Sequence, residues 1–250
     1  MGRITDTVKT LLIINIIFFV GSFGLGDAAI QWFALWFPKN DNFQIWQIIT
    51  HMFMHGDTTH IFFNMFMLYM FGSHLEQSIG QQKFLFLYFS AGLGAAGLQI
   101  LFTYLQFYPA YQVYIEAGFT PVEITTFIEE AIQTGQFQIH PTIDKEVTQN
   151  MIRAFSIPMV GASGAISGVI MAFAVLYPNL PLYLLFIPVP IKAKYLIGVY
   201  FLIDLYGGIT GNSILGPSNV AHWAHVGGAV IGFLTMYYWK KNSFNHNRWN

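Results

Sequence analysis

The chain has 250 residues, of which 54% are hydrophobic and only 9% charged, and its formal net charge is −1. A soluble domain normally carries about 25% charged residues, so this chain has too little charge to cover a water-exposed surface, and the lipid bilayer is the expected solvent. The small net charge offers no basic surface to nucleic acid, and the absence of cysteine excludes disulfides, thiolate metal sites and a cysteine nucleophile.

Six apolar segments are candidates for transmembrane helices, each of which needs about 20 mostly apolar residues. They cover residues 8–25, 57–72, 84–105, 158–177, 195–207 and 221–239. Several contain glycine, serine, histidine or asparagine, which usually face the interior of a helical bundle. We therefore predict an all-α, polytopic membrane protein, with six transmembrane helices in a single domain over residues 1–250.

Basic residues predict the orientation, because lysine and arginine are enriched in cytoplasmic loops. With the N-terminus inside, only Lys39, Lys145 and Arg153 of the eleven basic residues lie outside. Both termini are then expected in the cytoplasm, in a bacterial inner membrane. The first segment follows Arg3 as in a signal peptide, but no convincing cleavage site comes after it, so we expect it to be retained.

Two outer connections are long. Residues 28–46 are rich in aromatic side chains and are expected to lie partly in the membrane interface. The insert at 106–157 contains a capping box, Thr120-Pro121-Val122-Glu123, which predicts a helix ending near Gly135, and a second helix is expected over 144–155. We interpret this insert as an acidic, solvated outer cap, with a lid or a substrate-binding element as the alternative.

Three polar clusters interrupt the apolar segments, within residues 51–64, 161–168 and 222–232. The second, fourth and sixth spans all run from outside to inside in this orientation. At about 1.5 Å per residue, His60, Ser163 and His225 then lie within about 10 Å of the outer boundary. The topology alone therefore brings these side chains to one layer.

Ser163 and His225 have the chemistry of a nucleophile and its general base. A serine hydroxyl attacks a carbonyl only when a base takes its proton, and a neutral imidazole is the usual base. Glycines around both residues would let their helices approach closely. The four that we expect to give this structural support are Gly161, Gly164, Gly228 and Gly232.

His60 and Asn64 lie four residues apart, on one face of a helix, and both side chains donate hydrogen bonds. Together with the backbone N–H of Ser163, they could stabilise the oxyanion of an acyl-transfer reaction. Asp204 is the only acidic residue well inside a predicted span. A triad through Asp204 stays open, but a Ser–His dyad is the simpler interpretation.

These clusters resemble the motifs of the rhomboid family of intramembrane serine proteases. Gly161-x-Ser163-Gly164 is similar to the family's nucleophile motif, and Ala224-His225-x-x-Gly228-x-x-x-Gly232 to the helix of its catalytic histidine. The pattern of His55, His60 and Asn64 matches the family's second span, and Glu76 falls where many members carry a glutamate. Order and spacing agree over about residues 40–240.

The resemblance implies a six-helix bundle with a Ser163–His225 dyad and an oxyanion hole containing His60 and Asn64. It also implies a serine endopeptidase that cleaves transmembrane substrates near the outer membrane face, without a metal or cofactor. The sequence departs from the family at Gln47, where many relatives have arginine, and at Ser167, where many have an aromatic residue. The outer insert is also longer than usual.

Two other functions stay open. His51, His55, His60, His222 and His225 could supply imidazole ligands for zinc, as in an intramembrane metallohydrolase. That interpretation lacks an H-E-x-x-H motif and leaves Ser163 unexplained. A non-enzymatic membrane protein could instead use the polar layer to bind a peptide or lipid.

Overall fold

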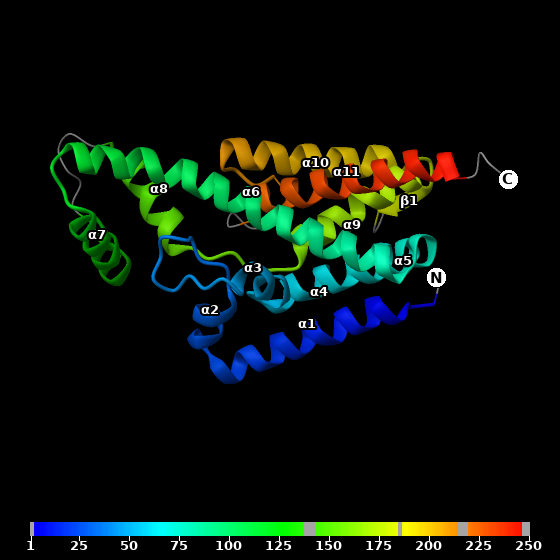
Figure 1. The fold of residues 1–250 in the computed structure, drawn as a ribbon, viewed down its shortest axis with the longest axis horizontal. Coiled ribbons are helices and arrows are strands. Elements are labelled where there is room, and N and C mark those ends of the chain that lie inside the picture. The colour runs from blue at the N-terminus through cyan, green and yellow to red at the C-terminus, as the bar shows by residue number, and fades with distance from the viewer. Residues whose placement is uncertain (1–2, 138–143, 185–186, 215–219, 247–250) are drawn as a thin grey trace.

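The protein is mostly helical, as predicted. The computed structural model describes residues 3–137, 144–184, 187–214 and 220–246, and a helix lies at each of the six predicted spans (Figure 1). These helices are α1 (Asp6–Leu25), α4 (Thr58–Met67), α6 (Gln81–Glu116), α9 (Ser163–Leu176), α10 (Ala193–Thr210) and α11 (His222–His246). By length and composition, α1 and α6 are apolar enough to cross a membrane, and α9 is a shorter apolar helix. The count of six spans therefore stays a prediction.

Helix α9 forms the centre of the bundle. Ten of its 14 residues are buried, and it packs against α11 and α6 (Figure 1). Small residues permit this packing: a Cβ added to Gly232 would lie 2.1 Å from the carbonyl oxygen of Gly168. Side chains of α1, α4 and α6 complete the apolar core around α9.

The second predicted span is longer than expected. After α4 the helix passes through a π-helical turn, η2 (Leu68–Gly72), into α5 (Ser73–Ile79). The extension is held because Glu76 is buried and accepts hydrogen bonds from the Thr5 hydroxyl and from the Val8 backbone N–H. This contact joins the end of α5 to the beginning of α1.

The outer insert forms a helical cap at the far end of α6, on the left of Figure 1. Its helices α7 (Pro121–Thr134) and α8 (Lys145–Ser156) confirm the two predicted helices, and the capping box of Thr120 and Glu123 is present. Helix α6 continues past the predicted end of the third span near residue 105, through Pro109 to Glu116. A proline inside a helix removes a backbone hydrogen bond, but Phe107 and Tyr114 on this extension are buried in the core of the cap.

The connection between α1 and α4 is partly helical and tightly anchored. It contains α2 (Asp27–Phe33), α3 (Gln47–Thr50) and the 3-10 turn η1 (His51–Phe53). Gln47 is fully buried and makes four hydrogen bonds to backbone groups. Its partners are the N–H groups of Trp36 and Gln44 and the carbonyls of Gln31 and Asn42. Gln47 thus anchors the loop at the position where many relatives have arginine.

A small hairpin precedes α10 and departs from a purely helical fold. Strands β1 (Pro181–Leu184) and β2 (Ile187–Lys192) pair antiparallel, with Pro181 opposite Lys192. The sequence did not predict this hairpin, because its three prolines and its continuous apolar run hide the alternation typical of a strand. The hairpin connects α9 to α10.

Candidate functional site

Ser163 is the first residue of α9, and a strained backbone turn presents it. Gly161 has φ +122°, which only glycine adopts readily, and its N–H donates to the carbonyl of His51. The first N–H groups of a helix have no acceptor within the helix. The Ser163 hydroxyl therefore lies beside backbone donors at the beginning of a helix.

His225 lies one turn into α11 and meets Ser163 directly. The distance from His225 Nε2 to Ser163 Oγ is 2.8 Å. The side chain of His225 is 12% exposed, so the pair is shielded but not sealed from solvent. This is hydrogen-bond geometry for proton transfer from a serine hydroxyl to an imidazole.

Asp204 of α10 lies on the other side of the His225 ring. Its Oδ1 is 3.0 Å from Nδ1 of His225 and 2.8 Å from Nδ1 of His222. The triad through Asp204, which the sequence left open beside the simpler dyad, therefore has its carboxylate within hydrogen-bond distance of the imidazole. The signal in the sequence was the isolation of Asp204 as an acidic residue inside a span, where ionisable groups are expensive and usually paired.

His60 and Asn64 occupy successive turns of α4, whose N-cap Asp57 accepts a hydrogen bond from the His60 backbone N–H. The ring of His60 lies against Gly161: a Cβ added there would be 2.8 Å from Nε2 of His60 and 3.5 Å from Oγ of Ser163. The structure thus brings His60 beside Ser163. Asn64 is buried, and its amide nitrogen has no hydrogen-bond partner within the described residues.

The four glycines expected to support the site fall into two groups. Gly161 provides the turn before Ser163, and Gly164, Gly228 and Gly232 lie at contacts between helices. A Cβ on Gly164 would be 2.4 Å from the Cβ of Ala95 on α6. The backbones of α6, α9 and α11 therefore converge at the Ser163–His225 pair.

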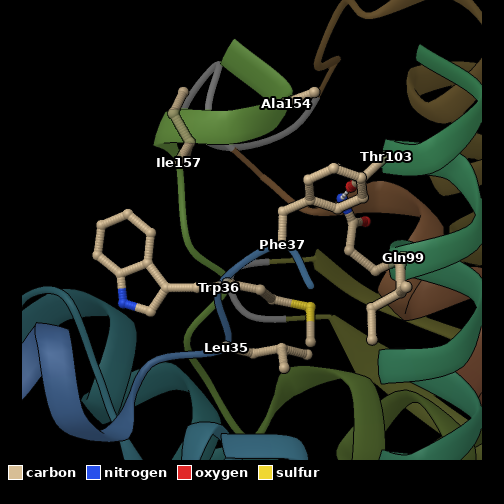
Figure 2. A pocket seen from close by; sticks show the side chains of 9 residues that line it. Leu35, Trp36, Phe37, Gln99, Thr103, Ala154 and Ile157 are labelled. Atoms are coloured by element: carbon tan, nitrogen blue, oxygen red, sulfur yellow. Dashed lines mark hydrogen bonds between the residues drawn. The ribbon is translucent and has the colours of Figure 1, made fainter. Parts of the chain in front are cut away.

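Two small cavities flank this region. One is lined by Ser167, Tyr200, Asp204 and His225 together with apolar residues of α9, α10 and α11. The other lies between the loop at Leu35–Phe37, α6 and the end of α8, where Figure 2 shows Gln99 and Thr103 on α6 across from Phe37. His225 lines the first cavity, whereas neither Ser163 nor His225 lines the second.

The five histidines considered as zinc ligands do not all converge on one point within the described residues. His51 Nδ1 lies 2.8 Å from the carbonyl of Gln47, so that ring nitrogen is engaged within its own turn. Among the described residues, the one group whose donor atoms lie within 4.8 Å of one another comprises Asp204, His222 and His225. The same carboxylate oxygen lies within hydrogen-bond distance of both imidazoles.

The comparisons with known proteins all point to the same family. The Rhomboid domain model matches residues 42–242. RHOMBOID-like protein 12, mitochondrial, of Arabidopsis thaliana is 29% identical over 212 residues, which are 82% of this chain and 50% of that protein. Rhomboid-like protease 3 of Toxoplasma gondii is 32% identical over 60 residues, which are 24% of this chain and 23% of that protein.

The chain thus spans half or less of the length of these curated relatives. The domain match nevertheless covers most of the chain and includes the helices that carry Ser163, Asp204 and His225. The protein is an integral membrane protein and belongs to the rhomboid family.

Proposed function

We propose that this protein is an intramembrane serine endopeptidase in which Ser163 is the nucleophile and His225 the general base. The observation that carries the proposal is the 2.8 Å distance between Ser163 Oγ and His225 Nε2. In the first step Nε2 takes the hydroxyl proton while Oγ attacks the substrate carbonyl carbon. The protonated imidazole then gives its proton to the leaving amine nitrogen, and an ester to Ser163 remains.

Water completes the cycle by the same route. His225 takes a proton from a water molecule, the resulting hydroxide attacks the ester, and Ser163 recovers its proton as the new carboxyl end leaves. Water must therefore reach the polar residues inside the bundle, which fits a site that is not sealed from solvent.

Three groups are proposed to stabilise the oxyanion: the imidazole of His60, the amide of Asn64 and the backbone N–H of Ser163. The position of His60 against Gly161 supports its part, and the buried amide nitrogen of Asn64 is a donor without a partner in the described structure. Donors held in place before the charge develops give the largest single contribution to many such reactions.

We propose transmembrane protein segments as substrates, cleaved near the outer membrane face. A helix hides its carbonyls behind its own hydrogen bonds, so the substrate must unwind locally before Ser163 can attack. Scissile bonds are therefore expected near small or helix-breaking residues. Cleavage sites mapped to the middle of stable leucine-rich helices would contradict this part of the proposal.

The excess of lysine and arginine on one side supports an orientation with both termini in the cytoplasm. We propose this orientation in a bacterial inner membrane. Protease-accessible tags at the two ends test it in sealed inverted vesicles and in spheroplasts. Both tags should be digested in the vesicles and protected in the spheroplasts.

The function is tested with purified protein in detergent, a fluorophosphonate probe and a panel of fluorogenic transmembrane substrates. Labelling and cleavage should both disappear in Ser163→Ala and His225→Ala. The matched control is Ser90→Ala, because within the described residues that hydroxyl bonds only to the carbonyl of Leu87 in its own helix. Cleavage that persists in Ser163→Ala would overturn the proposal. If no substrate is cleaved at all, the result would favour a non-enzymatic membrane protein that binds a peptide or lipid.

The alternative is a metallohydrolase, favoured by the convergence of Asp204, His222 and His225. Their oxygen and nitrogen donors would suit zinc, and a bound metal would activate water. The same assay distinguishes the two functions. A chelator should leave a serine protease active, whereas loss of cleavage on chelation together with an active Ser163→Ala variant would establish the metal reaction.

A further inference from the structure

We propose that Asp204 is the positioning residue for His225 and that His222 in turn holds Asp204, so that the proposed Ser–His pair operates as a four-residue chain. This inference rests on the proposed function. Its basis is the convergence of two imidazoles on one carboxylate oxygen, at 2.8 Å and 3.0 Å. Asp204 and His222 are 5% and 7% exposed, so water does not compete strongly for these hydrogen bonds.

The interface of α10 and α11 is built to permit this convergence. A Cβ on Gly207 would lie 2.6 Å from Nε2 of His222, so only glycine leaves room for that ring. One residue later, a Cβ on Gly208 would lie 3.0 Å from the indole of Trp223, whose Nε1 donates to the Gly208 carbonyl at 3.0 Å. Two adjacent glycines thus bring α11 against α10, one turn after Asp204.

The hydrogen bonds determine where the protons lie. An ionised carboxylate only accepts, so both imidazoles donate Nδ1–H to Asp204. Nε2 of His222 is buried without a partner in the described part of the chain, which disfavours a second proton there, because a buried unpaired donor is costly. His225 with its proton on Nδ1 has its lone pair on Nε2, the atom that faces Ser163.

This arrangement orients the base during the proposed reaction. As Nε2 takes the serine proton, the positive charge that forms on His225 lies next to the Asp204 carboxylate, which stays ionised. Ser167, on the adjoining face of α9, is too small to pack over the ring of His225. The side chain that orients the ring is therefore Asp204 on α10. Among the described residues, the other titratable groups near His225 are Tyr200 on α10, His222 on its own helix and His60 on α4.

The first test compares Asp204→Asn with the exposed control Asp41→Asn. An amide that donates to Nδ1 favours the wrong tautomer, and the same change in soluble serine proteases lowers kcat by about 10⁴. We expect at least about a 100-fold loss of kcat for Asp204→Asn, with little change in KM, and no loss for Asp41→Asn. Asp204→Glu should recover part of the activity.

A pH profile separates positioning from a merely structural effect. In Asp204→Asn the acid limb of the kcat profile should move to lower pH, because the imidazolium loses its carboxylate partner. His222→Ala should shift the acid limb of the kcat profile by a smaller amount. If Asp204→Asn has a kcat within threefold of the parent and an unchanged profile, Asp204 has no positioning role, although the proposed function, tested by Ser163→Ala, would stand.

A measurement on the protein with Asp204 in place covers the case in which the Asp204 variants do not fold. With ¹⁵N-labelled histidine and assignment by His225→Gln, the ¹⁵N shifts should show His225 protonated at Nδ1 and unprotonated at Nε2. The opposite tautomer would overturn the proposal. So would stoichiometric zinc in the purified protein that is lost in Asp204→Asn, because a metal would take the Nδ1 lone pairs.

Discussion

The α-carbon of Gly228 lies so close to Gly164 that an added Cβ would be 1.9 Å from the Gly164 carbonyl oxygen. Gly228→Ala must therefore push α11 away from α9 and separate Ser163 from His225. We expect a loss of about 1–3 kcal/mol in the free energy of unfolding and a loss of fluorophosphonate labelling. Denaturation in detergent and labelling rates measure the two effects. Gly198→Ala on α10 is the control, since a Cβ added there would have no other atom within 4 Å.

The four hydrogen bonds of Gln47 predict that this position tolerates neither alanine nor arginine. Gln47→Ala leaves two backbone N–H groups and two carbonyls without their partner, at about 1–3 kcal/mol for each that stays buried. Gln47→Arg adds donors but removes the acceptor for Trp36 and Gln44. Thermal unfolding should show a lower midpoint for both variants and an unchanged midpoint for the exposed Gln44→Ala. A stable Gln47→Arg protein would show that the loop is anchored elsewhere.

Acid should destabilise the fold through two histidines of the α2–α4 connection. Burial lowers the pKa of His51 and His55 from 6.5 to about 4. Below pH 6.5 the unfolded chain therefore takes up protons that the folded chain does not, and stability falls as the pH falls. The resulting decrease in the free energy of unfolding approaches about 3 kcal/mol for each histidine at pH 4 and then levels off.

Unfolding followed by tryptophan fluorescence between pH 7 and pH 4 measures this slope. The double variant His51→Gln and His55→Gln should have a flatter profile, whatever its stability at pH 7. His74→Gln, which changes an exposed side chain, should leave the slope as it is. An equally steep profile in the double variant would assign the acid sensitivity to other groups.

The capping box of α7 predicts the stability of the outer cap. Thr120 and Glu123 exchange hydrogen bonds, and the bonds from Thr120 lower the pKa of Glu123. Thr120→Ala should cost about 1 kcal/mol, which raises the population of the opened helix about fivefold. Limited proteolysis within residues 106–157 should accelerate by that factor. Thr126→Ala, on the exposed side of the same helix, should not change the rate.

The sequence predicted those parts of the fold that depend on local chemistry. The apolar segments located six helices, and Thr120 and Asp144 identified the beginnings of two more. The shared depth of Ser163, His225 and His60 followed from the direction of three spans, and the structure places these residues together. Charge bias and helix rise were enough for that inference.

The remaining features depend on tertiary contacts that no local pattern encodes. Asp204 reaches His225 only because Gly207 and Gly208 bring α10 against α11. The continuation of α6 through Pro109 depends on apolar partners from α7 and α8, far along the chain. The anchoring by Gln47 likewise depends on the fold of its own loop, which the sequence did not reveal.

The length of α6 has a consequence for where the cap sits. Its 36 residues extend about 54 Å at about 1.5 Å per residue, whereas the hydrocarbon layer is about 30 Å thick. Even at about 40° of tilt, α6 would cover about 41 Å along the membrane normal. The helix is therefore longer than the lipid tails are deep, so we expect it to carry α7 and α8 beyond the hydrocarbon layer, where they have an apolar core of their own.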